Sequence, residues 1–102
     1  MIISISADPV ARAELSMFVS ERRADIVELK SLLDAQSQQQ ATDLAGHMAD
    51  MGKLFRLVFL ELLAQRLHNA LRLDYNKVIE PAIEEMTSYL DSLEDELAQK
   101  CA

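Results

Sequence analysis

The segment from Ile79 to Leu97, IEPAIEEMTSYLDSLEDEL, decides the fold class of this chain. Its large apolar residues recur at alternating spacings of four and three, which is the pattern of one buried helix face. They are Ile79, Ile83, Met86, Leu90, Leu93 and Leu97. Pro81 lies inside the pattern and has no N–H to donate, so we expect the last helix to begin near Glu80 or Pro81.

Further helical patterns precede this segment and are separated from one another by short polar stretches. One apolar stripe comprises Leu57, Leu60, Leu63 or Ala64, Leu67 and Leu71, and an earlier one comprises Leu44, Met48, Met51 and Phe55. Asp8-Pro9 is a helix-start signal, which predicts a first helix over Pro9 to Phe18. Ser20 can cap a second helix that ends near Gln36. We expect turns at AQSQQQ (35–40) and at Asp74 to Asn76.

The composition favours one small helical domain. Half of the 102 residues are apolar, and there are only two glycines and two prolines. We therefore expect a single domain over residues 1–102. Its predicted fold is all-α, an antiparallel up-and-down four-helix bundle with a short extra N-terminal helix.

The net charge indicates which class of partner to expect, and the cysteine content indicates which cellular compartment. The net charge is −7 and the ten basic residues are scattered among seventeen acids, which argues against nucleic-acid binding. No apolar run is long enough to span a membrane, and the opening MIISISADP lacks the features of a signal peptide. The single cysteine, Cys101, fits a reducing compartment. We expect a cytoplasmic protein with protein partners, and the start at Met1 favours a free protein.

The two histidines are the first candidates for chemistry. Asp43 and His47 are four residues apart and can share a helix face, but two ligands make a weak metal site, so we expect no metal. The alternative for this pair is an exposed hydrogen bond. His68 is one step off its apolar stripe, and we expect it at a boundary or on the surface. No nucleophile set or phosphate-binding glycine loop stands out.

A series of motifs extends from about residue 8 to residue 93. They are Asp8-Pro9, Phe18, Ile26-Val27-Glu28-Leu29 with Leu33, Leu44-Ala45, and Leu63-Ala64-Gln65-Arg66-Leu67 with Ala70-Leu71. In these motifs the chain resembles the histidine-phosphotransfer (Hpt) domains of bacterial phosphorelays. The resemblance implies a helical bundle in a two-component phosphorelay. Its partners would be a response-regulator receiver domain or a histidine kinase, and no cofactor is implied.

The chain departs from the family pattern at the reactive position. In the ungapped match the phosphorylated histidine falls on Gly46, the family's lysine on Ala49 and its small glycine on Asp50. Relative to the stripe through Leu44 and Met48, Gly46 should point away from the core, while His47 should lie only about 60° from it. We therefore expect a pseudo-Hpt protein, which is not an enzyme and which docks its partner without transferring phosphate.

The expected docking patch lies on the exposed face of the helix that carries His47. It comprises Gly46, His47, Ala49, Asp50 and Lys53, with Arg22 from the preceding helix. One alternative is a phosphocarrier in which His47 is the nucleophile. A second is a helical assembly module that pairs through the last helix, although that stripe is expected to close its own bundle and leave a monomer.

Overall fold

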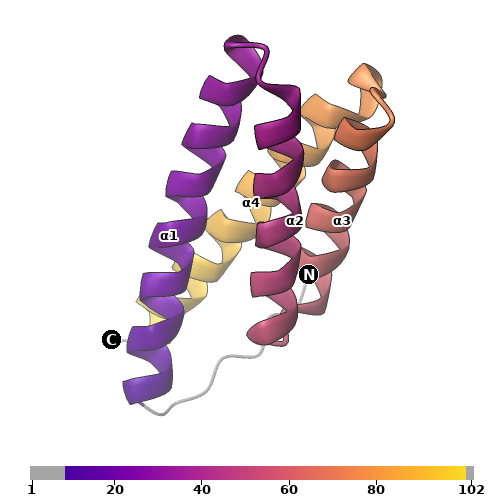
Figure 1. Ribbon diagram of the computed structural model, residues 1–102. Coiled ribbons are helices and arrows are strands. Elements are labelled where there is room, and N and C mark those ends of the chain that lie inside the picture. The colour runs from indigo at the N-terminus through magenta and orange to yellow at the C-terminus, as the bar shows by residue number, and fades with distance from the viewer. Residues whose placement is uncertain (1–8, 101–102) are drawn as a thin grey trace.

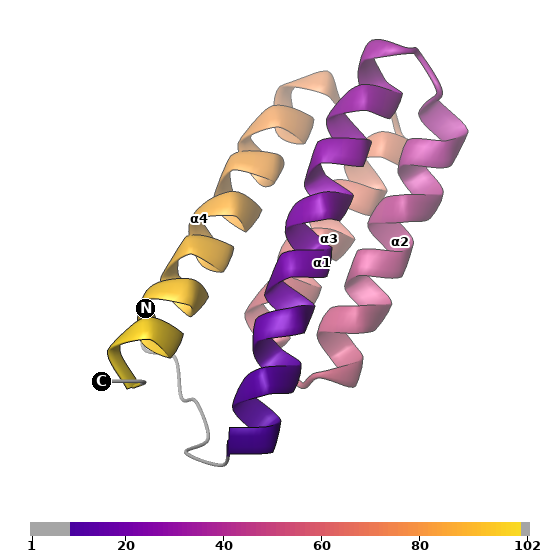
Figure 2. The same cartoon turned by 90° about the vertical axis from the view of Figure 1, so that its left-hand side faces the viewer.

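The computed structural model describes residues 9–100, which form four α-helices (Figure 1). They are α1 (Pro9–Asp34), α2 (Gln38–Leu54), α3 (Val58–Arg72) and α4 (Asn76–Lys100). Each helix packs on the next along the chain, and α4 also packs on α1 (Figure 2). The α1–α2 and α3–α4 turns lie at one end of the bundle, and the α2–α3 turn lies at the other (Figure 1). The expected all-α fold is confirmed.

The first helix is continuous, so the prediction of a separate short N-terminal helix was wrong. α1 passes through Ser20 without a break and ends at Asp34. No glycine or proline interrupts the chain there, and Phe18, Arg22, Ile26 and Leu29 are all buried at helical spacing across the expected boundary. The start at Pro9 is confirmed, while Asp8 and Cys101 lie outside the described residues.

The predicted start of the last helix was also wrong, because α4 begins at Asn76 and contains Pro81. A proline at this position removes the single hydrogen bond to the carbonyl of Lys77. Both Lys77 and Pro81 are exposed, so water can satisfy that carbonyl. Burial of Ile79 and Ile83 on the opposite side holds the helix together across the proline.

The three turns share one design, which explains their equal length. In each turn one non-glycine residue has a positive φ: Gln36 (60°), Arg56 (57°) and Asp74 (59°). The next residue donates its N–H to a carbonyl five positions back, as Leu57 does to Gly52 at 2.8 Å. This arrangement is the Schellman motif, which ends one helix and turns the chain into the next.

The core lies between the four helices and includes the complete apolar stripe of α4. All six residues of that stripe, Ile79, Ile83, Met86, Leu90, Leu93 and Leu97, are at most 8% exposed. The stripe therefore packs mainly against the other helices of its own bundle, as expected. α2 and α3 approach closely at Gly52, where an added Cβ would lie 2.9 Å from the backbone nitrogen of Glu61.

Candidate docking face on α2

The orientation of α2 differs from the one that its large apolar residues predict. Its buried residues are Ala41, Thr42, Ala45, Met48, Ala49 and Gly52, whereas Leu44 and Met51 are only partly buried. At about 100° per residue, the centre of this buried face is rotated by about 90° from the predicted stripe. Small residues form the face because α2 packs closely against its neighbours, and small side chains allow that approach.

This rotation reverses the expected roles of Gly46 and His47. His47 is exposed and points about 160° away from the centre of the buried face. Gly46 is partly buried and faces α3, so the prediction that it points away from the core was wrong. A Cβ at residue 46 would lie 3.3 Å from Nδ1 and 3.4 Å from Cε1 of His68.

His68 is fixed in this position by a hydrogen bond to α2. Its Nδ1 lies 3.0 Å from the carbonyl oxygen of Thr42, which can only accept, so Nδ1 carries the proton and donates it. The predicted boundary position of His68 agrees with its partial burial. Gly46 therefore has a structural reason: it leaves the space that the His68 ring occupies.

The exposed face of α2 is polar and has His47 near its centre. Asp43 precedes His47 by one turn and Asp50 follows it by one turn, and both carboxylates are exposed. Asp43 accepts a hydrogen bond from Gln39 at 3.0 Å, and within the part of the chain that the structure describes Asp43 and His47 are not hydrogen-bonded to each other. Lys53 is also exposed, six residues beyond His47.

Two residues of the predicted patch are buried and were assigned to it wrongly. Ala49 is 7% exposed and faces the interior because of the rotation of α2. Arg22 is 3% exposed, lies 4.9 Å above the ring of Phe18 and donates from Nε to Asp25 at 2.7 Å. Arg22 therefore stabilises α1 and its contact with the core, and it does not reach the α2 face.

Apolar side chains that the sequence analysis did not assign to a site extend this face toward α3. Leu54, the last residue of α2, is 71% exposed, and Val58 and Leu62 on α3 are 63% and 56% exposed. Their spacing of four residues places Val58 and Leu62 on one side of α3. The sequence contains a signal for this surface: the segment from Leu54 to Leu62 has more apolar residues than one buried helix face can hold.

The α2 face and the neighbouring side of α3 present charged and apolar side chains to solvent. Within residues 10–98, no group of three His, Cys, Asp or Glu side chains gathers as metal binding would require. None of the four described helices has the length and apolar character needed to cross a bilayer. No protein-family model, curated protein or solved structure matches the chain.

Proposed function

We propose that the chain is an Hpt-like signalling protein, an antiparallel up-and-down bundle that docks a response-regulator receiver domain or a histidine kinase without transferring phosphate. The docking surface is the exposed α2 face, which we define as Asp43, His47, Asp50, Lys53 and Leu54. The observation that carries the proposal is the exposure of all five residues on one helix. The proposal puts the protein in the cytoplasm as a monomer without a cofactor.

The combination of residues on the α2 face suits recognition of a protein. Leu54 supplies apolar area at one end of the face, and Val58 follows directly after the α2–α3 turn. Interfaces commonly combine such an apolar contact with a polar rim that selects the partner. The charged residues Asp43, Asp50 and Lys53 would form that rim around His47.

The charges beside His47 argue against stable phosphorylation. A phosphohistidine adds close to two negative charges, and the carboxylates of Asp43 and Asp50 lie one turn away on the same face. Each carboxylate within about 6 Å disfavours the phosphorylated form by an energy on the order of 1 kcal/mol near a surface. Lys53, at six residues, is too far along the helix to compensate directly.

Binding of receiver domains to charge variants tests the docking proposal. Isothermal titration calorimetry against a panel of receiver domains should find a partner whose affinity falls by more than about twofold with Asp50→Lys. Leu54→Glu should weaken binding by about tenfold, because it puts a charge in the apolar contact. Glu28→Lys, an equal charge change at an exposed site on α1, is the matched control. Equal effects of Asp50→Lys and Glu28→Lys would contradict the α2 face.

A second candidate function is favoured by the exposure of His47, since an accessible imidazole is what a phosphocarrier needs. In this reaction Nε2 of His47 attacks the phosphorus of a receiver's phospho-aspartate, and the bond from phosphorus to the carboxylate oxygen breaks. The aspartate leaves as a free carboxylate. The reaction needs no distortion of the helix, because His47 is already exposed on the regular helix α2.

Transfer of radiolabelled phosphate separates the two candidates. Charged receiver domains are incubated with the wild type and with His47→Ala, and His68→Ala serves as the control histidine. Label that appears on the wild type and on His68→Ala, but not on His47→Ala, would establish the phosphocarrier and refute docking without transfer. Absence of label with every receiver that binds would support docking alone.

A further inference from the structure

α1 and α4 are joined tightly at only one end of their contact. Near the start of α1, Arg12 donates to the carbonyl of Leu97, and at the middle of α1, Arg23 forms ion pairs with Asp91 and Glu94. Figure 1 shows α4 crossing obliquely behind α2, close to α1 at the end where α1 starts and nearer to α3 at the other. The charged side chains therefore close one half of the α1–α4 contact.

In the other half of the α1–α4 contact, charged residues stand at equivalent positions of the two described helices but form no ion pair. Lys30 follows Arg23 by seven residues on α1, and Glu84 precedes Asp91 by seven on α4. In two helices of opposite direction these positions would face each other two turns farther along. Among the described residues Lys30 and Glu84 form no ion pair, because the two helices have separated there.

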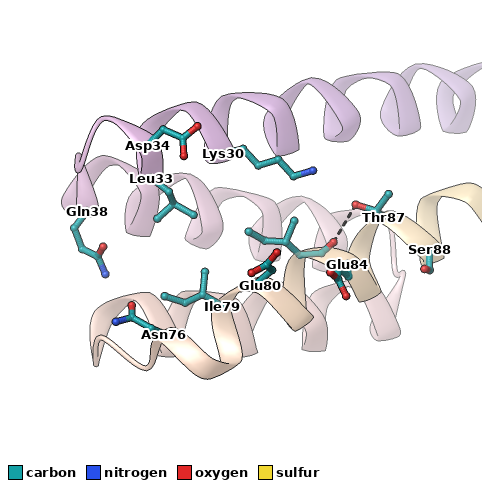
Figure 3. Close-up of a pocket in the computed structure, with 11 residues that line it drawn as sticks. Lys30, Leu33, Asp34, Gln38, Asn76, Ile79, Glu80, Glu84, Thr87 and Ser88 are labelled. Atoms are coloured by element: carbon teal, nitrogen blue, oxygen red, sulfur yellow. Dashed lines mark hydrogen bonds between the residues drawn. The ribbon is translucent and has the colours of Figure 1, made fainter.

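A groove of about 850 Å³ occupies the space between the separated helices (Figure 3). Its apolar lining comes from the partly buried Leu33 on α1 and from the small exposed parts of Ile79 and Ile83 on α4. Three carboxylates, those of Asp34, Glu80 and Glu84, also line it, together with the single cation Lys30. Figure 3 shows side chains of both helices along this gap, with Lys30 on the α1 side and Glu80 and Glu84 on the α4 side.

We propose that this groove binds a basic amphipathic helix of another protein. Apolar side chains of that helix would pack on Leu33, Ile79 and Ile83, and its Lys or Arg residues would pair with Glu80 and Glu84. The lining of α4 from Asn76 to Ser88 is about 18 Å long, which matches about three turns of a partner helix. The length of the groove and its negative charge therefore both favour a basic helix as the bound partner.

Charge also disfavours a second copy of this chain as the occupant. The chain has a net charge of −7, and α4 alone carries seven acidic residues and two lysines. Placing another copy against an acidic groove would bring like charges together unless it offered a basic helix. The α1–α4 groove is separate from the α2 face, so its function does not depend on the proposed docking of a receiver domain.

A designed peptide tests the groove directly. The probe is a fluorescent amphipathic helix of about 18 residues with leucines on one face and lysines on the flanks, and the matched peptide has glutamates in place of the lysines. Fluorescence anisotropy with the full chain should detect saturable binding of the lysine peptide only. The double variant Glu80→Lys with Glu84→Lys should weaken this binding by about tenfold or more. The control is Glu28→Lys with Asp95→Lys, which makes the same charge change at exposed sites outside the groove.

Amide chemical shifts and sedimentation complete the test. On addition of the lysine peptide, the largest shift changes should map to residues 30–38 and 76–88. The proposal is overturned if the lysine peptide does not saturate by about 1 mM, if the control variant loses as much affinity as the groove variant, or if the shifts map to the α2 face. It is also overturned if sedimentation shows a dimer that the groove variant abolishes, because a second copy would then be the occupant. Circular dichroism verifies that both variants remain folded.

Discussion

The ring of His68 would crowd a methyl group at residue 46, whose Cβ would lie 3.3 Å from Nδ1, and Nδ1 holds the ring in place by donating to the carbonyl of Thr42. A glycine inside a helix normally costs about 1 kcal/mol relative to alanine. Here that cost is offset by the contact between α2 and α3. The glycine is thus explained by a neighbour on another helix, which sequence spacing along α2 does not reveal.

This contact predicts non-additive behaviour of Gly46→Ala. In the wild type the added Cβ would press against Nδ1 at 3.3 Å, so the gain in helix propensity should largely cancel, with a net change below about 0.3 kcal/mol. In a His68→Ala background the ring is gone, and Gly46→Ala should stabilise the protein by about 0.5–1 kcal/mol. Urea unfolding of the four proteins measures this coupling. Equal effects of Gly46→Ala in both backgrounds would contradict the contact.

Tyr89 predicts a loss of stability in alkaline solution. Its side chain is 5% exposed beside the ring of Phe59, and burial raises the pKa of Tyr89 above its ordinary value of 10.0. The unfolded chain therefore releases this proton first, so the stabilisation is complete below pH 10.0 and is lost as the pH rises through the folded pKa. The measurement is the free energy of unfolding against pH for the wild type and Tyr89→Phe. The phenylalanine variant should lose less stability above pH 10.0, and parallel curves would refute the role of Tyr89.

At the scale of helices and turns, each Schellman turn contains a left-handed residue that is not glycine. Such a conformation costs about 1–2 kcal/mol for a residue with a Cβ, whereas glycine adopts it freely but loses more entropy on folding. Arg56 is exposed, and its side chain makes no hydrogen bond or ion pair with the other described residues. The turn between α2 and α3 is therefore the best place to relieve this strain.

Arg56→Gly should stabilise the protein by about 0.5–1 kcal/mol. In urea unfolding the midpoint should rise while the slope stays unchanged. The matched control is Arg66→Gly, the same replacement inside α3, which should destabilise by about 1 kcal/mol because it puts glycine in a helix and removes the pair with Glu85. A lower midpoint for Arg56→Gly would show that the left-handed conformation is not the source of strain.

The helices were more predictable than their boundaries and faces, for physical reasons that differ from one helix to the next. The α4 stripe consists of large apolar residues and identifies the buried face directly. α2 buries alanine and glycine instead, so the pattern of large residues misassigned Gly46 and His47. The break near Ser20 and the start at Pro81 were local signals, which burial along α1 and α4 overrode. The α1–α4 groove depends on helix crossing, which no local pattern contains.

At the scale of the whole molecule, charge and exposed apolar area lie on different helices. α4 carries seven of the seventeen acidic residues. Of the nine exposed large apolar side chains among the described residues, six lie between residues 54 and 75. They are Leu54, Val58, Phe59, Leu62, Leu73 and Tyr75. The molecule therefore has an acidic side and a side with exposed apolar side chains, of which Leu62, Leu73 and Tyr75 line one shallow depression, and exposed apolar area commonly marks an interaction site.

The distribution of exposed apolar side chains predicts where the protein binds apolar molecules. Leu62→Lys replaces a side chain that is 56% exposed and near the middle of the apolar segment, so it should lower the fluorescence of a bound apolar dye by about half. Its free energy of unfolding should change by less than about 0.5 kcal/mol, because little core area is lost. Val27→Lys is the control: Val27 is 69% exposed on α1, outside the segment from 54 to 75. Because one isolated apolar side chain binds little dye, Val27→Lys should leave the fluorescence nearly unchanged, and equal losses in the two variants would mean that the apolar side chains around α3 do not act together.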